Sequence, residues 1–346
     1  MKKTCQTSDM FSKLRHCVAY FTSKMLRRKF RTVALVLTAL LTTYVCAFLL
    51  SNPSNAPTSL PSRSRPRDDC KTWKESPQHK TTLKTKTSCA RNYFLLVLVS
   101  SAPANQDRRN LIRQTWGTDD NVPPMWKTYF LIAQTENQTH SGLVKKEDEA
   151  YGDLIRADYY ENYWKQSFKI MMAFEWASRY CKFSYIMKAD DDILVNTADL
   201  IKFLLKKSTP EKNLFLGRLH HNPAVRREGK WKVSYEEYNH THYPDFCSGA
   251  GFVMTYDVIE CIVPLFDVIK PYRMDDVYVG MLAHAIGVIA VDHRGFFMPF
   301  DGYDDCNFVP NVLAQHRATG QCLTKLLNIH KNRKDFLFSR KLGTFF

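Results

Sequence analysis

Short apolar runs bounded by polar residues follow one another from residue 91 onward and predict the strands of a folded domain. The clearest lie at residues 93–99 and 128–133, and further strands are expected at 152–158 and 183–188. Between the last two, apolar side chains recur every four positions from Phe168 to Tyr180, as on one face of a helix. Strands that alternate with helices predict an open α/β sheet, mostly parallel, with flanking helices.

A longer apolar stretch precedes this domain. Residues 32–50 contain no charged side chain over 19 positions, close to the ~20 residues that span a bilayer. Basic residues crowd residues 24–31, whereas residues 51–60 carry no charge. The positive-inside rule therefore predicts a cytosolic tail at 1–31, a transmembrane signal anchor and a lumenal remainder. A cleaved signal peptide is the alternative, although its basic region would be unusually long and no A-x-A site ends it.

Residues 51–90 are rich in Ser, Thr, Pro and Lys and almost free of apolar side chains, which predicts a flexible stem. The remaining chain, 91–346, is then the folded domain. The chain carries a formal net charge of +15, yet residues 91–346 hold 32 basic and 30 acidic residues. Because the basic excess lies in the tail and the stem, it does not indicate a nucleic-acid partner.

Cysteines and glycosylation sequons agree with a lumenal domain. Seven of the ten cysteines follow residue 50, and no C-x-x-C pair occurs. An oxidising compartment permits disulfides among them, and the odd number leaves at least one unpaired or intermolecular. Asn137 and Asn239 begin N-x-T sequons and are candidate N-glycosylation sites.

Three consecutive carboxylates, Asp190, Asp191 and Asp192, follow the strand expected at 183–188. A solvated charge run is the simplest interpretation of such a triplet. Here, however, apolar residues flank it on both sides, and parallel sheets bind ligands beyond the carboxyl ends of their strands. Adjacent carboxylates at a buried edge need a cation, and hard oxygen ligands without cysteine favour Mn²⁺ or Mg²⁺.

A second acidic pair, Asp275 and Asp276, opens an apolar helix that runs through Ala285. Acids at a helix N-terminus are often only caps or dipole partners. The functional alternative makes one of the two a general base. Ser248 to Gly251 form a turn of small residues, which is either a tight turn or a place where backbone approaches a sugar closely.

Arginines follow the first predicted strand, on a short basic helix expected at 107–116. Arg108, Arg109 and Arg113 lie on it, with Trp116 at its end. Surface arginines are ordinary, but at the mouth of an α/β sheet guanidinium groups suit a diphosphate or uridine-bearing ligand.

The ordered motifs together resemble the lumenal β1,3-glycosyltransferases, which include galactosyl- and N-acetylglucosaminyltransferases. The resemblance covers about residues 93–324 and rests on RRNLIRQTWG (108–117), YGDLI (151–155), DYYENYWKQSFK (158–169), the DDD triplet, YPDFCSGAG (243–251) and DDVYVG (275–280). It implies a GT-A-type nucleotide-sugar-binding fold and an inverting, Mn²⁺-dependent transfer from a UDP-sugar to a glycan acceptor, in the Golgi membrane.

The resemblance also implies roles for individual residues. Asp276 would deprotonate the acceptor hydroxyl, and Asp192 would bind the metal, with His316 as second ligand and His293 as a nearby rival. The residues implied in shaping the nucleotide and sugar pocket are Asp190, Asp191, Arg109, Arg113, Trp116, Gly249 and Gly251. Lys165 and Asp245 depart from the family pattern without replacing an implied ligand, although Asp245 alters a candidate acceptor wall.

Two clues to the donor sugar conflict. Asp275 stands where galactosyltransferases commonly have Glu and resembles N-acetylglucosaminyltransferases, whereas Cys247-Ser248-Gly249 resembles the galactosyltransferases. We expect UDP-galactose, with UDP-GlcNAc as the alternative. A third hypothesis, from another class, is an inactive relative that acts as a lumenal chaperone or glycan-binding module.

Overall fold

The computed structural model describes residues 82–119, 121, 123–298 and 306–330. The predicted tail (1–31), anchor (32–50) and most of the predicted stem (51–81) lie outside these residues. In the described ranges, no helix combines the length and apolarity needed to cross a membrane.

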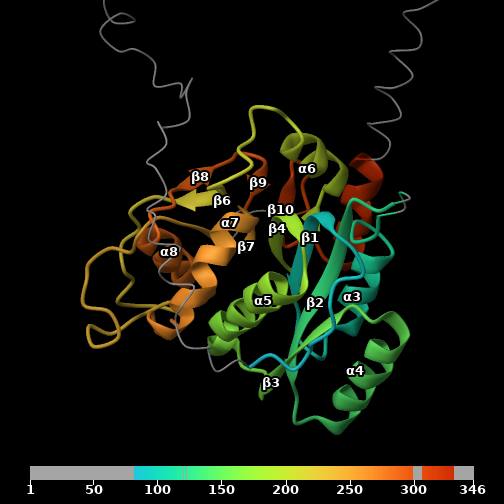
Figure 1. The fold of residues 1–346 in the computed structure, drawn as a ribbon, viewed down its shortest axis with the longest axis horizontal. Helices are drawn as coiled ribbons and strands as arrows, with labels where there is room; N and C mark the ends of the chain where they lie inside the picture. The colour runs from blue at the N-terminus through green and yellow to red at the C-terminus, as the bar shows by residue number, and fades with distance from the viewer. Residues whose placement is uncertain (1–81, 120, 122, 299–305, 331–346) are drawn as a thin grey trace, which may run out of the picture. The chain divides into compact units, whose positions relative to one another are not determined.

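A seven-stranded sheet with helices on both faces forms the core of the folded unit (Figure 1). Its strand order is β3-β2-β1-β4-β7-β6-β8. The strands are β1 (Tyr93–Ser100), β2 (Trp126–Gln134), β3 (Leu154–Tyr160), β4 (Phe183–Asp190), β6 (Phe215–His220), β7 (Phe246–Thr255) and β8 (Ala290–Asp292). The pairs among β3, β2, β1 and β4 are parallel, as is β6 with β8, whereas β7 runs antiparallel to both β4 and β6. The expected mostly parallel sheet is therefore confirmed, with β7 as the reversed strand.

Side chains of β1 alternate between two hydrophobic clusters, as the two-residue period of a strand requires. Leu96 and Leu98 pack on one face with α5, α7 and α8, whereas Leu95, Val97 and Val99 pack on the other with residues of α3, α4 and α6. The helices are α3 (Gln106–Arg113), α4 (Gln138–Tyr151), η1 (Tyr163–Lys165), α5 (Gln166–Tyr180), α6 (Thr197–Leu204), α7 (Tyr256–Ile262), η2 (Val263–Asp267) and α8 (Asp275–Ala285). Because the sheet is buried on both faces, the sequences of its parallel strands are nearly continuous apolar runs.

A small second sheet carries the segment after the acidic triplet. Its order is β5-β10-β9, with strands β5 (Ile193–Val195), β9 (Phe296–Phe297) and β10 (Ala314–His316). β10 pairs antiparallel with β5, and His316 lies opposite Ile193. This register brings a histidine from the end of the domain beside the triplet.

The end of the predicted stem packs against the domain. Leu83 is buried and forms an antiparallel bridge to Ala157, and Cys89 is disulfide-bonded to Cys181. The described end of the predicted stem, residues 82–90, is therefore held against the domain that was predicted to begin at Arg91. A second disulfide joins Cys306 to Cys322.

Candidate active site

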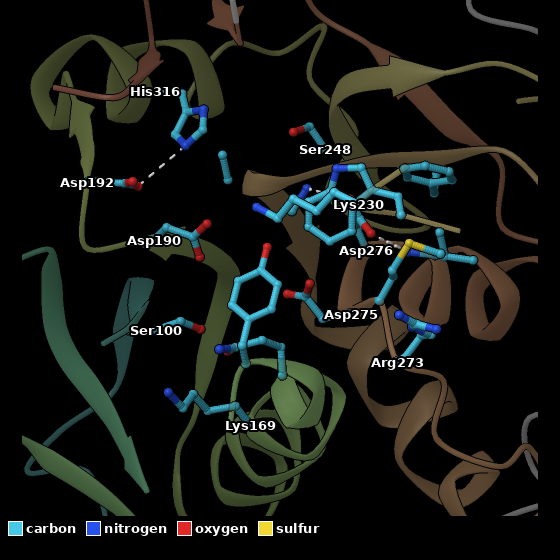
Figure 2. Close-up of a pocket in the computed structure, with 18 of the residues that line it drawn as sticks. Ser100, Lys169, Asp190, Asp192, Lys230, Ser248, Arg273, Asp275, Asp276 and His316 are labelled. Atoms are coloured by element: carbon cyan, nitrogen blue, oxygen red, sulfur yellow. Dashed lines mark hydrogen bonds and ion pairs between the residues drawn. The ribbon is translucent and has the colours of Figure 1, made fainter. Parts of the chain in front are cut away.

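A cavity of about 740 Å³ opens beyond the carboxyl ends of β1 and β4. Its volume lies within the range of about 300–1,000 Å³ that is usual for small-molecule sites. Both acidic motifs line it, the triplet Asp190–Asp192 and the pair Asp275 and Asp276, and so does His316. Figure 2 shows Asp192 and His316 together on one side of this pocket, with Asp275 and Asp276 on the other.

The members of the acidic triplet have different environments. Asp191 is hydrogen-bonded on both carboxylate oxygens: it accepts from Ser101 Oγ (2.7 Å), Asn105 Nδ2 (2.9 Å) and Arg108 Nη1 (2.9 Å). Asp190, the last residue of β4, accepts from Lys188 Nζ at 2.7 Å. Asp191 thus fastens the triplet to the end of β1, and Asp190 is neutralised by a lysine.

Asp192 is the member that faces a potential ligand. Its Oδ1 atom is buried and has no hydrogen-bond partner among the described residues, and His316 Nε2 lies 3.5 Å away. Burial would raise the pKa of Asp192, but the neighbouring His316 holds it below its usual range. A carboxylate oxygen and an imidazole nitrogen at this separation fit a divalent cation between them. In the described ranges no group of three or more His, Cys, Asp or Glu side chains is arranged to hold a metal.

His293, the rival histidine, lies elsewhere. Its ring packs against Phe203, and its Nδ1 accepts a hydrogen bond from the Gly295 amide. The structure therefore places His316, and not His293, beside Asp192.

Lys188 connects the two acidic motifs. This buried lysine contacts Asp190, the Asp275 carboxylate at 3.2 Å and the Gly249 carbonyl oxygen. Desolvation opposes its charge, yet the two carboxylates raise its pKa above the ordinary value. Lys188 thus holds the end of β4, the start of α8 and strand β7 in one arrangement; the turn expected at 248–251 is part of this strand. Sequence reasoning missed it, although its position two residues before Asp190 on one strand puts both side chains on the same face.

Asp276 has the environment of a general base. Its Oδ2 accepts a hydrogen bond from the Gly249 amide at 3.2 Å, and its Oδ1 accepts from the Val277 amide at 2.8 Å. Burial, followed by the adjacent charge of Asp275, raises the pKa of Asp276 to about 7. A carboxylate with a pKa near neutrality is a better proton acceptor than an ordinary aspartate. A capping role alone does not account for this placement.

Contrary to the expectation from sequence, the residues of the arginine motif do not line the cavity. Arg109 is fully buried, with Nε 2.8 Å and Nη2 2.7 Å from the two Glu147 oxygens. Arg113 binds Asp153 and Glu147, and Trp116 is buried in the core beneath α3. These side chains are built into the scaffold because their partners come from α4 and the start of β3, far away in sequence.

The two candidate glycines also differ. Gly249 lines the cavity, and a Cβ there would lie 3.3 Å from Asp276 Cβ. Gly251 lies within β7, opposite Ala189 of β4, where a Cβ would come within 2.9 Å of Ile193 Cδ1. The absence of a side chain at Gly249 therefore leaves room for Asp276 beside the cavity, whereas the absence of one at Gly251 allows close packing against Ile193.

Asn137 and Asn239 are both exposed. Asn137 Oδ1 caps α4 by accepting from the His140 amide at 3.1 Å, which leaves its Nδ2 atom outside this bond. Cys247 is a free, buried cysteine, in agreement with an odd number of cysteines after residue 50.

Comparison with known proteins identifies the family. Residues 107–294 match the galactosyltransferase family. Human lactosylceramide 1,3-N-acetyl-beta-D-glucosaminyltransferase is 30% identical over 272 residues, 75% of this chain and 71% of the relative. UDP-GalNAc:beta-1,3-N-acetylgalactosaminyltransferase 1 of Sus scrofa is 35% identical over 248 residues (68% and 74%), and beta-1,3-galactosyltransferase 1 of Mus musculus is 30% identical over 251 residues (71% and 77%).

Among solved structures, the galactosyltransferase LgtC in complex with donor and acceptor sugar analogs is similar at a TM-score of 0.34 and 12% identity, covering 65% of this chain and 87% of that one. The family match spans more than half of the chain, and the relatives are aligned over most of their own length. The chain therefore belongs to the galactosyltransferase family and is a β1,3-hexosyltransferase.

Proposed function

We propose that this protein transfers galactose from UDP-galactose in β1,3 linkage to a glycan acceptor on a glycoprotein or glycolipid, with inversion at the anomeric carbon. The observation that carries the proposal is the single cavity that holds a base of raised pKa, Asp276, and a facing carboxylate–imidazole pair, Asp192 and His316. Inverting transfer needs a proton acceptor for the incoming alcohol and charge relief for the departing diphosphate.

In the proposed reaction Asp276 accepts the proton of the acceptor hydroxyl as its oxygen forms a bond to C1 of the donor sugar. The bond between C1 and the β-phosphate oxygen breaks, and its electron pair leaves with UDP. Attack opposite the α-linked diphosphate gives a β product. The Gly249 and Val277 amides hold the Asp276 carboxylate in place for this step.

Asp192 and His316 are the residues that would hold Mn²⁺ or Mg²⁺. A bound divalent cation would supply Lewis-acid stabilisation of the diphosphate as its negative charge develops. Asp191, held by three hydrogen bonds, and Asp190, paired with Lys188, would support the triplet from the side of β1 and β4.

N-Acetylhexosamine transfer is the second candidate. Two of the three relatives above are named for N-acetylglucosamine or N-acetylgalactosamine transfer, and the latter donor was not among our expectations. Asp275, the sequence clue to an N-acetylhexosamine donor, lines the cavity, whereas Cys247, part of the clue to galactose, is fully buried. Cys247 therefore does not contact a donor in this cavity, whereas Asp275 can.

We place this enzyme in the Golgi membrane as a single-pass type II protein with a lumenal catalytic domain. The uncharged stretch at 32–50 and the basic residues before it support this topology. Disulfides Cys89–Cys181 and Cys306–Cys322 suit an oxidising lumen, as do the exposed sequon residues Asn137 and Asn239. The alternative of an inactive chaperone is disfavoured because both acidic motifs, the triplet and the pair Asp275 and Asp276, are present around one cavity.

A donor screen tests the proposal. The full-length protein is incubated with UDP-galactose, UDP-GlcNAc or UDP-GalNAc and a panel of β-linked acceptor saccharides, with and without Mn²⁺. We expect metal-stimulated transfer from UDP-galactose and a β-anomeric product by NMR. Consumption of only an N-acetylhexosamine donor would select the second candidate, and absence of transfer from all three would contradict the proposal.

A further inference from the structure

Three aromatic side chains form an exposed cluster beside the cavity. Tyr163 and Trp164 both belong to η1, and Trp231 comes from the loop between β6 and β7. Their ring centroids lie 5.1 Å (Tyr163–Trp164), 5.9 Å (Tyr163–Trp231) and 6.1 Å (Trp164–Trp231) apart. Tyr163 remains 49% and Trp164 40% exposed. We call these three residues the aromatic cluster; grouped aromatic surface of this kind marks a binding site more often than isolated exposed rings do.

The aromatic cluster is continuous with the active site. Tyr163 and Trp231 line the same cavity as Asp276. The carboxylates of Asp190 and Asp275 line this cavity too, and burial, followed by these two charges, raises the pKa of Tyr163. A ligand seated on these rings would therefore reach the reacting groups.

Cationic side chains adjoin the rings. Lys230 Nζ lies 4.6 Å from the Trp231 centroid and 5.1 Å from the Tyr163 centroid, and Arg273 Cζ lies 4.2 Å from the Trp164 centroid. Both cations line the cavity, and Figure 2 shows Arg273 on the side of Asp275 and Asp276. Together the set offers flat apolar surface and several N–H donors next to it.

This combination matches a saccharide. A pyranose ring has a face of C–H bonds that packs on aromatic rings and a rim of hydroxyls that accepts hydrogen bonds. Arg273, which contacts the Trp164 ring, stands three residues before Asp276, the residue proposed to receive the proton of the acceptor hydroxyl. The sugar that brings its hydroxyl to Asp276 is the acceptor.

We infer that the aromatic cluster is the acceptor subsite, in which a pyranose ring of the acceptor glycan packs on Tyr163, Trp164 and Trp231 while Lys230 and Arg273 bind its hydroxyls. This inference rests on the proposed function. The placement also gives a role to the DYYENYWKQSFK motif, of which Tyr163 and Trp164 are part.

Acceptor kinetics of Trp231→Ala and Trp164→Ala test the inference. Transfer is measured in the full-length protein against methyl β-D-galactopyranoside and methyl N-acetyl-β-D-glucosaminide at saturating UDP-sugar, together with UDP release in the absence of acceptor. We expect the KM for the used acceptor to rise about tenfold or more in each variant. The donor KM and acceptor-free UDP release should stay within about twofold of wild type.

Tyr235→Ala is the matched control, because Tyr235 lies in the same loop and is 65% exposed but packs against Arg227. It should leave the acceptor KM unchanged. If Trp231→Ala also loses acceptor-free UDP release, the acceptor KM of Trp231→Phe and of Trp164→Ala is used in its place. An unchanged acceptor KM in variants that still release UDP overturns the acceptor subsite and favours a protein-contact role. A wild-type protein that transfers no sugar and releases no UDP in the presence of the acceptors contradicts the proposed function itself.

Discussion

Arg109 and Glu147 form a bidentate ion pair in which neither side chain is exposed to solvent. Arg109 Nη1 also donates to Ser101 Oγ at 3.0 Å, and Ser101 Oγ in turn donates to Asp191 Oδ2 at 2.7 Å. The buried pair thus supports the acidic triplet through a single hydroxyl. Burial would raise the pKa of Glu147, but the hydrogen bonds from Arg109 and Arg113 lower it below the usual range.

Arg109→Met should destabilise the fold by about 3–5 kcal/mol, because it leaves the Glu147 charge buried with only Arg113 as partner. Urea unfolding of the full-length protein measures the loss. Arg108→Met is the matched control: Arg108 is largely exposed and should cost about 1 kcal/mol or less. If Arg109→Met unfolds like wild type but loses affinity for UDP, Arg109 is a ligand after all.

The fall of kcat/KM at acid pH should follow the protonation of Asp276. Its pKa is raised to about 7, and the base works only when deprotonated, so kcat/KM should fall about tenfold per unit as pH drops below about 7 and level off above it. Asp275 lies beside it, so Asp275→Asn should move this fall to lower pH. A profile that stays flat between about pH 5 and 8 would exclude Asp276 as the titrating base.

Metal binding should depend on Asp192 and His316. Mn²⁺ is expected to raise the melting temperature of the wild-type protein, and Asp192→Asn or His316→Ala should remove that shift, because each supplies one candidate ligand. His293→Ala is the control, since His293 packs against Phe203 instead. An undiminished Mn²⁺ shift in both ligand variants would place the metal elsewhere.

Gly249→Ala should slow transfer about tenfold or more, since small displacements of reacting groups are costly. The added Cβ would lie 3.3 Å from Asp276 Cβ and 3.4 Å from its Oδ2, so the base must shift. Gly142→Ala serves as control: a Cβ there meets nothing within 4 Å, and in helix α4 it should stabilise by about 0.5–1 kcal/mol without changing kinetics. Wild-type rates in Gly249→Ala would show that the base tolerates displacement.

The sequence predicts the part of the fold that local pattern determines. Strands β1, β2 and β4 follow from continuous apolar runs, and helix α5 follows from its apolar repeat, because most residues of each element are buried. The reversed strand β7 and the three-residue β10 could not be predicted, since their pairing depends on chain segments far away in sequence.

The same limit applies to the site. The acidic residues could be identified because charge at the end of an apolar strand is unusual. The burial of Arg109 could not, because its partner Glu147 lies 38 residues away and an isolated arginine on a helix reads as surface or ligand. Lys188 was overlooked because a lysine inside an apolar strand looks like an edge residue until both its carboxylate partners are known.

The most direct test of the account is transfer by Asp276→Asn, measured beside UDP affinity in the presence of Mn²⁺. The account predicts that kcat falls by about 10²–10⁴-fold, the usual contribution of a general base, while UDP binds as in the wild type. A variant that transfers sugar at the wild-type rate would contradict it.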